Sequence, residues 1–194
     1  MTLSLIVFCE AVLALAAFVA LGGLQHARLP AVLFWAIGLG LIAVTAMVGV
    51  FAFAGVNWAQ GLHQTLNTLS ATVGSLSLLL GGLFTFTFRL TGQVALIVTA
   101  LCVGVLVAVG IGVIPTFGLG WPILAMIGLA LIALLALRRY PDGARWLLAG
   151  VLLAALADLG RRGILSAIPV APINLYHLLL AVSVLSLRRA ARFN

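Results

Sequence analysis

Few side chains in this chain could do chemistry, because 65% of its 194 residues are hydrophobic and only 7% are charged. Ionisable groups within such apolar stretches are costly unless they are paired or neutralised, so each one is a candidate functional residue. The candidates are Glu10, His63, Asn67, Asp158, Arg161, Arg162, Asn174, Tyr176 and His177. Together they offer groups that could hold a metal ion, transfer a proton or bind a polar ligand.

Glu10 and Asp158 are the candidate catalytic carboxylates. Glu10 has no basic residue three or four positions away, so we expect it to be protonated, to pair with a histidine or arginine of another helix, or to bind a metal. Asp158 precedes Arg161 and Arg162 at the two spacings that place side chains on one helix face. That spacing also predicts an ordinary ion pair at a helix end, and the sequence leaves both interpretations open.

His63 and His177 are the candidate metal ligands. Each has a carboxamide one helical turn away, Asn67 for the first and Asn174 for the second. With Glu10 they form a candidate metal or acid/base site; the sequence leaves the cofactor open, with zinc as the candidate ion. The residues expected to bind a cofactor or a headgroup are Asn67, Asn174, Tyr176, Arg161 and Arg162.

Apolar stretches of about 20 residues predict that the chain crosses a membrane seven times. The expected spans cover residues 3–24, 31–54, 62–88, 94–114, 122–138, 146–163 and 172–188. The predicted fold class is therefore an all-α integral membrane protein, a single seven-transmembrane-helix domain over residues 1–194. An odd number of spans places the termini on opposite sides.

The arginines predict the orientation of this bundle, because positively charged short loops are retained in the cytoplasm. Only Arg161 and Arg162 fall on one side of the seven spans, and the other eight arginines fall on the opposite side. The amino terminus is thus expected outside and the carboxyl terminus in the cytoplasm, in a membrane of the bacterial inner type. Tryptophans are expected to form a belt at each interface, with Trp35 and Trp146 inside and Trp58 and Trp121 outside.

The net charge of +7 comes from these arginines, which are expected at the membrane surface, so the charge predicts the lipid bilayer as partner and not nucleic acid. The chain has no lysine, and this excludes a retinal-binding protein, because retinal forms its Schiff base with a lysine amine.

In the predicted orientation, the candidate residues converge on the outer half of the bilayer.

Small and polar residues predict which helix faces meet, because membrane helices pack through close backbone approach. The longest such stripe lies in the span over residues 62–88 and comprises His63, Asn67, Ser70, Gly74, Ser77 and Gly81. Matching faces are expected on residues 31–54, 146–163 and 172–188. The spans over 94–114 and 122–138 carry fewer such residues, so we expect them at the periphery.

Three local segments resemble the CREST superfamily of seven-helix membrane proteins, which includes the alkaline ceramidases and the progestin and adiponectin receptor-type proteins. They are Phe34-Trp35, the run over residues 46–55 and Asn174-Leu175-Tyr176-His177. The resemblance implies a zinc-dependent hydrolase of lipid amides, or a relative of one. It assigns His177 as the retained histidine of the last helix and Glu10 as the acid of the first.

The chain departs from the ligand pattern of that family. Ala52 stands where the family has a histidine near the end of the second helix, with Thr45 as the surviving hydroxyl. The third helix has Asn67 in place of an aspartate, and the second histidine of the last helix is replaced by Pro172 or Ile173. The resemblance therefore implies either that His63 has taken over a ligand role or that the chain is a non-hydrolytic relative.

Three functions remain open from the sequence. The first is a metal-dependent hydrolase of lipid amide or ester bonds, with His63 and His177 as ligands and Glu10 or Asp158 as third ligand or general base. The second is a non-catalytic protein or complex subunit that binds a lipid headgroup, a quinone or a membrane-protein partner in its outer polar pocket. The third is a haem protein with iron between the two histidines.

Overall fold

The computed structural model describes residues 3–26, 28–88, 90–113, 120–162, 164 and 170–193, and over these residues the only regular secondary structure is helical. This confirms the all-α prediction. The α-helices and two short helical turns are α1 (Leu3–Gly22), η1 (Gly23–His26), α2 (Ala31–Phe53), α3 (Asn57–Leu69), η2 (Ser70–Gly74), α4 (Ser75–Phe86), α5 (Gly92–Gly110), α6 (Gly120–Ala136), α7 (Pro141–Arg161) and α8 (Pro172–Ala191).

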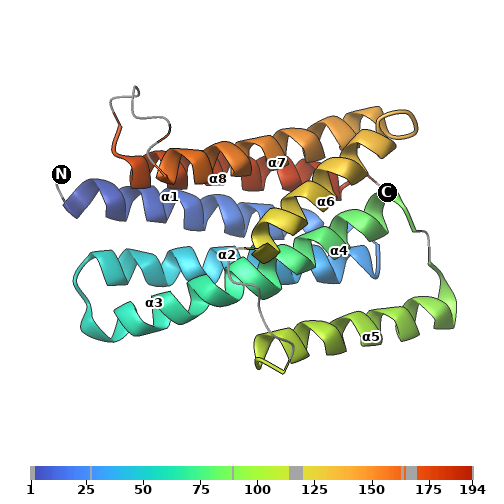
Figure 1. Ribbon diagram of the computed structural model, residues 1–194, viewed down its shortest axis with the longest axis horizontal. Coiled ribbons are helices and arrows are strands. Elements are labelled where there is room, and N and C mark those ends of the chain that lie inside the picture. Colours follow the sequence, from blue (N-terminus) through green and yellow to red (C-terminus); the bar gives the residue numbers. More distant parts are fainter. Residues whose placement is uncertain are drawn as a thin grey trace.

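The helices run back and forth along one long axis (Figure 1). The closest packing joins α7 to α8, α1 to α2 and α1 to α8, while α3 and α4 lie along α2. The connections after α1, α4 and α6 reach the end of the bundle where the chain finishes, and α1 begins at the opposite end (Figure 1). We call these the carboxyl-terminal end and the amino-terminal end of the bundle.

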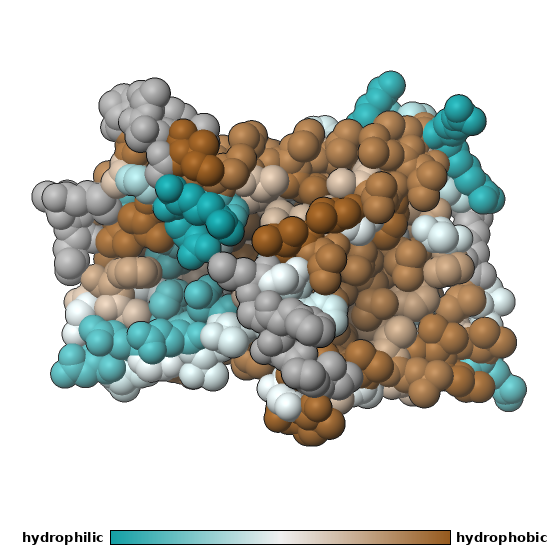
Figure 2. Space-filling model, in the orientation of Figure 1, coloured by the Kyte–Doolittle hydropathy of each residue, from teal (hydrophilic) through white to brown (hydrophobic). Residues whose placement is uncertain are grey.

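Five helical stretches are long and apolar enough to cross a membrane: Leu5–Gln25, Ala31–Phe53, Asn57–Phe86, Gly92–Gly110 and Pro141–Arg161. Gly120–Ala136 is a shorter apolar helix. Large hydrophobic side chains are exposed along the bundle, including Leu15, Leu101 and Leu135 at 66%, 66% and 82%. Figure 2 shows a broad apolar surface on one face of the molecule, with hydrophilic residues gathered toward the two ends. Such a surface is typical of contact with lipid and unusual for contact with water.

The third of these stretches differs from its predicted bounds. It begins at Asn57, five residues before the expected start, and runs without a break through α3, η2 and α4. Its middle segment, Ser70–Gly74, has π-helical hydrogen bonding. Single π turns inside α-helices occur frequently at functional sites, because the extra residue changes which side chains face inward.

The second half of the predicted stripe on this long helix faces the bundle interior, whereas Asn67 in its first half is exposed and His63 and Ser70 are half-buried. Gly74, Ser77 and Gly81 are buried, and Gly81 lies directly against the indole of Trp35 on α2. A Cβ added at Gly81 would lie 2.9 Å from that ring. The glycine therefore permits the close approach of α4 to α2.

Trp35 does not belong to an interfacial belt, so that expectation is wrong. Its side chain is fully buried, and its indole Nε1 donates a 2.9 Å hydrogen bond to Thr85 Oγ1 on α4. A buried indole needs such a partner for its N–H. Trp58 on α3 is 63% exposed, as a lipid-facing residue would be.

Of the two helices expected at the periphery, only one lies there. Most of α5 is exposed, and it packs chiefly against the π segment Ser70–Gly74. By contrast, α6 lies between α4 and α7 and buries Leu129, Ile132 and Ala133. The prediction failed for α6 because its leucines and alanines form a packing face without any polar residue to mark it.

Candidate functional site

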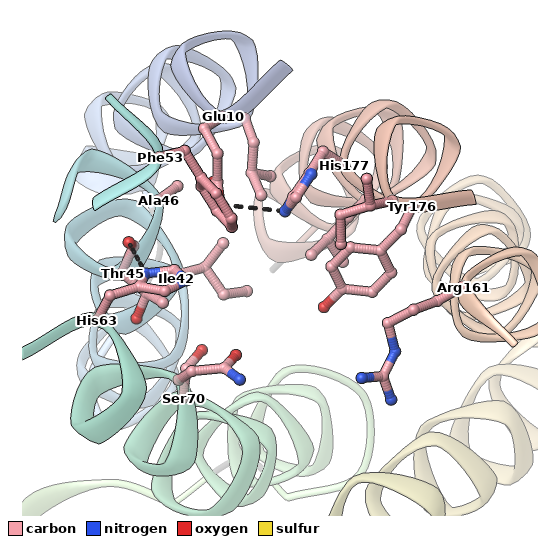
Figure 3. Close-up of a pocket in the computed structure, with 14 residues that line it drawn as sticks. Glu10, Ile42, Thr45, Ala46, Phe53, His63, Ser70, Arg161, Tyr176 and His177 are labelled. Carbon is pink, nitrogen blue, oxygen red and sulfur yellow. Dashed lines mark hydrogen bonds and ion pairs between the residues drawn. The ribbon is translucent and has the colours of Figure 1, made fainter. Parts of the chain in front are cut away.

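A polar cavity of about 120 Å³ lies among α1, α2, α3, α7 and α8, toward the amino-terminal end of the bundle (Figure 3). This volume has room for several water molecules or a small polar group. The side chains that line it with nitrogen or oxygen atoms are Glu10, Thr45, His63, Asn67, Ser70, Arg161, Tyr176 and His177. Leu13, Ile42, Ala46, Phe53, Ile173 and Leu180 supply the apolar part of the wall.

Glu10 and His177 join α1 to α8 at one wall of this cavity. Glu10 Oε1 lies 3.1 Å from His177 Nε2, and the two residues are only 1% and 5% exposed. Of the three alternatives for Glu10, the structure therefore shows pairing with a histidine of another helix. His177 Nδ1 is buried with no hydrogen-bond partner among the described residues, so Glu10 is the polar anchor of this imidazole.

His63 occupies the facing wall, where α3 packs on α2. Its Nδ1 lies 3.2 Å from the carbonyl oxygen of Thr45. A carbonyl only accepts hydrogen bonds, so Nδ1 carries the hydrogen of this contact. Phe53 packs edge-on against the imidazole, with 5.5 Å between the ring centroids. These contacts hold the ring in one orientation.

Gly49 on α2 lets Glu10 and His63 approach each other. A Cβ built on Gly49 would lie 2.6 Å from Glu10 Oε1 and 3.0 Å from His63 Cε1. Glu10 Oε1 and His63 Cε1 therefore both lie close to the backbone of Gly49. The Glu10 carboxyl group contacts the imidazole of His177 and lies near the imidazole of His63. Any side chain at position 49 would push these groups apart.

Asp158 forms the predicted ion pair at the end of α7. Its Oδ1 accepts a 3.1 Å hydrogen bond from Arg161 Nη2, and its Oδ2 accepts a 2.8 Å bond from Arg162 Nε. Arg161 also lies over the ring of Tyr176, with its Cζ 5.8 Å from the ring centroid. Asp158 thereby positions Arg161 at the rim of the cavity.

The structure brings six of the nine candidate residues together as cavity lining: Glu10, His63, Asn67, Arg161, Tyr176 and His177. Asp158 and Arg162 do not line the cavity; their side chains pair with each other at the end of α7. Asn174 is buried one turn before His177 and also lies outside the lining.

Sequence reasoning did not assign three further residues to the site. Ser70 was recognised only as a small packing residue, Thr45 as a packing residue and as the hydroxyl in the family resemblance, and Phe53 carried no signal in an apolar helix. Thr45 has a structural role as well, because its hydroxyl donates to Leu41 O and to Leu66 O and so ties α2 to α3. A hydroxyl on the predicted packing face of α2, opposite His63, was the available clue.

The donors of this cavity do not fit the zinc ion that the family resemblance implies. Among the described residues, no group of three or more histidine, cysteine, aspartate or glutamate side chains is arranged to hold a metal. His177 Nε2 is engaged by Glu10 and His63 Nδ1 by a backbone carbonyl. The cavity is also too small for a porphyrin, so the haem hypothesis finds no support.

Comparison with known proteins gives no further guide to the site. No protein-family model matches the chain, no curated protein matches it, and no solved structure matches it. The functional argument therefore rests on the residues themselves.

Proposed function

We propose that this chain is an integral membrane protein of seven spans that binds the polar headgroup of an amphipathic molecule in its cavity, without catalysis. One observation carries the proposal: the chain gathers its scarce polar side chains around one cavity of about 120 Å³ within an otherwise apolar bundle. Ionisable residues are rare in apolar bundles, so their grouping around one cavity favours a ligand site.

The distribution of arginine supports an outside position for this cavity. Arg138, Arg139, Arg145, Arg188 and Arg189 lie where α6, α7 and α8 meet the carboxyl-terminal end of the bundle. Arg189 lies over the indole of Trp146, with 4.2 Å between Cζ and the ring centroid. An arginine and tryptophan pair of this kind is typical of a membrane interface. On this basis the cavity opens toward the outer leaflet of a bacterial-type plasma membrane.

A mixed lining suits an amphipathic ligand. Polar atoms of α1, α3, α7 and α8 can bind a headgroup, and Leu13, Ile42 and Leu180 can contact the first carbons of a chain. Most ligand sites combine an apolar wall with a few placed polar groups in this way. On this proposal the chain is a non-hydrolytic counterpart of the CREST superfamily.

The test is to identify the lipids that copurify with the protein and to fill the cavity. Ser70→Leu places a larger apolar side chain in the lining, and Thr68→Leu is the matched control on the same helix, where the threonine is exposed and bonds only to Gln64 O. We expect mass spectrometry to find a bound amphiphile in the wild type and in Thr68→Leu, and at least tenfold less in Ser70→Leu. Equal lipid in all three proteins would refute the proposal.

A metal-dependent hydrolase makes the opposite prediction. It requires about one zinc per chain, lost in both His63→Ala and His177→Ala, together with release of fatty acid from lipid amides or esters. Elemental analysis of the purified protein therefore separates the two functions. Stoichiometric zinc with this dependence would replace the binding proposal by the hydrolase.

A further inference from the structure

The cluster at the cavity rim carries more positive than negative charge. Asp158 is the one carboxylate paired with both Arg161 and Arg162, so two cations share a single anion. The side chain of Asp158 is only 26% exposed. The two guanidinium groups therefore leave one positive charge in excess at this site, and an anion bound there would balance it.

Only one of the two arginines faces the cavity. Arg161 is part of its lining and Arg162 is not, although both side chains are 45% exposed. Figure 3 shows the guanidinium of Arg161 pointing into the open space beside Tyr176. A guanidinium has five N–H donors, and within the described part of the chain Arg161 uses one of them, for Asp158. Its other donors are available to a ligand.

We propose that Arg161 binds the anionic group of the ligand, a phosphate or a carboxylate, and that Asp158 and Tyr176 position it for this task. The inference rests on the proposed headgroup binding and adds the chemical class of the headgroup. Arginine suits this role because its planar fork can bind two oxygens of one phosphate or carboxylate at once. The Glu10 carboxylate on the other wall accepts hydrogen bonds, so it can bind a hydroxyl or amine of the same headgroup.

The pair of arginines provides its own control experiment. Arg161→Gln and Arg162→Gln remove the same charge from equally exposed side chains that bind the same aspartate. Wild type and both variants are purified in a neutral detergent, and their thermal unfolding is followed during titration with dioleoylphosphatidylglycerol, dioleoylphosphatidylcholine or inorganic phosphate. A ligand that binds the folded state raises the unfolding temperature in proportion to its affinity.

We expect an anionic probe to stabilise the wild type and Arg162→Gln alike, with at least tenfold weaker apparent affinity for Arg161→Gln. Phosphatidylglycerol as the active probe identifies a lipid as the source of the anion, and inorganic phosphate acting equally well identifies the free ion. The inference would be overturned if all three proteins bound the anionic probe with equal affinity, or if Arg161→Gln and Arg162→Gln lost affinity to the same extent. If Ser70→Leu loses its copurified amphiphile while Arg161→Gln keeps anion affinity, headgroup binding stands and the role of Arg161 fails.

Discussion

The carboxylate of Glu10 lies 3.1 Å from Nε2 of His177, and this contact joins the first helix of the bundle to the last. The two residues are 167 positions apart, and both are nearly fully buried. Burial removes both groups from bulk water, so each depends on the direct contact with the other. The contact therefore has two consequences, one for stability and one for the shape of the cavity wall.

We predict that breaking this contact is strongly destabilising. Removing one partner of a buried pair typically costs about 3–5 kcal/mol, because the other group is left without compensation. Glu10→Ala and His177→Ala should each approach this range, and the double variant should lose less than the sum by about 1–3 kcal/mol. Unfolding in mixed detergent micelles measures all three. Strict additivity would show that the two side chains do not interact.

The more exposed ion pair at the end of α7 supplies the comparison. Asp158→Ala removes two hydrogen bonds to arginine, at 3.1 and 2.8 Å, but the arginine side chains are 45% exposed. Ion pairs in such positions are worth roughly 1 kcal/mol or less. We therefore expect Asp158→Ala to unfold close to the wild type in the same assay, and a loss as large as that of Glu10→Ala would contradict this assignment.

Gly49 is predicted to be intolerant of any side chain. In Gly49→Ala the new methyl would lie 2.6 Å from Glu10 Oε1, so the carboxylate must move away from His63, at a cost of about 1–3 kcal/mol. Gly40→Ala is the control on the same helix, where an added Cβ meets nothing within 4 Å. It should be neutral or stabilising by up to about 1 kcal/mol. We also expect Gly49→Ala to retain less copurified amphiphile than Gly40→Ala.

The hydrogen bond between Trp35 and Thr85 gives a prediction for the packed core. Thr85→Val keeps the shape of the side chain but removes the acceptor of the buried indole N–H, which should cost about 1–3 kcal/mol. Thr99→Val on α5 removes a hydroxyl that bonds only to Ala95 O within its own helix. That control should unfold like the wild type. If the two valine variants unfold alike, the indole bond contributes nothing to stability.

Some features of this structure could be predicted from the sequence and others could not. A polar residue in an apolar helix is conspicuous, so the buried stripe from Gly74 to Gly81 and the pairing of Glu10 with a histidine were accessible to prediction. Gly49 was not, because its effect depends on how α1 and α3 cross α2. Trp35 was misplaced for a related reason: a tryptophan near a helix end suits an interface equally well until Thr85, fifty residues later, supplies its partner.

The number of spans is the last prediction. Two of the expected spans, α8 and α6, are not among the five long apolar stretches, and the sidedness of the middle of the chain depends on α6. This helix has 17 residues, about 26 Å at the usual rise of 1.5 Å per residue, slightly less than a hydrocarbon core of roughly 30 Å. Its place between α4 and α7 favours a crossing, because α4 is the second half of the long stretch Asn57–Phe86 and α7 is itself long enough to span. With α6 as a span, three crossings separate residue 60 from residue 142. Those two positions must then lie on opposite sides of the membrane.

Single-cysteine labelling tests this arrangement directly. The background for both variants is Cys9→Ala with Cys102→Ala, which removes the two native cysteines. Gln60→Cys should then react with a membrane-impermeant maleimide in intact cells, because position 60 is exposed and lies at the amino-terminal end of the bundle, toward which the cavity lies. Asp142→Cys, at the arginine-rich end, should react only after the membrane is permeabilised. Labelling of both positions from one side would mean that one of the three intervening helices does not cross. A reversed pattern would place the cavity toward the cytoplasm, so any headgroup bound there would belong to the inner leaflet.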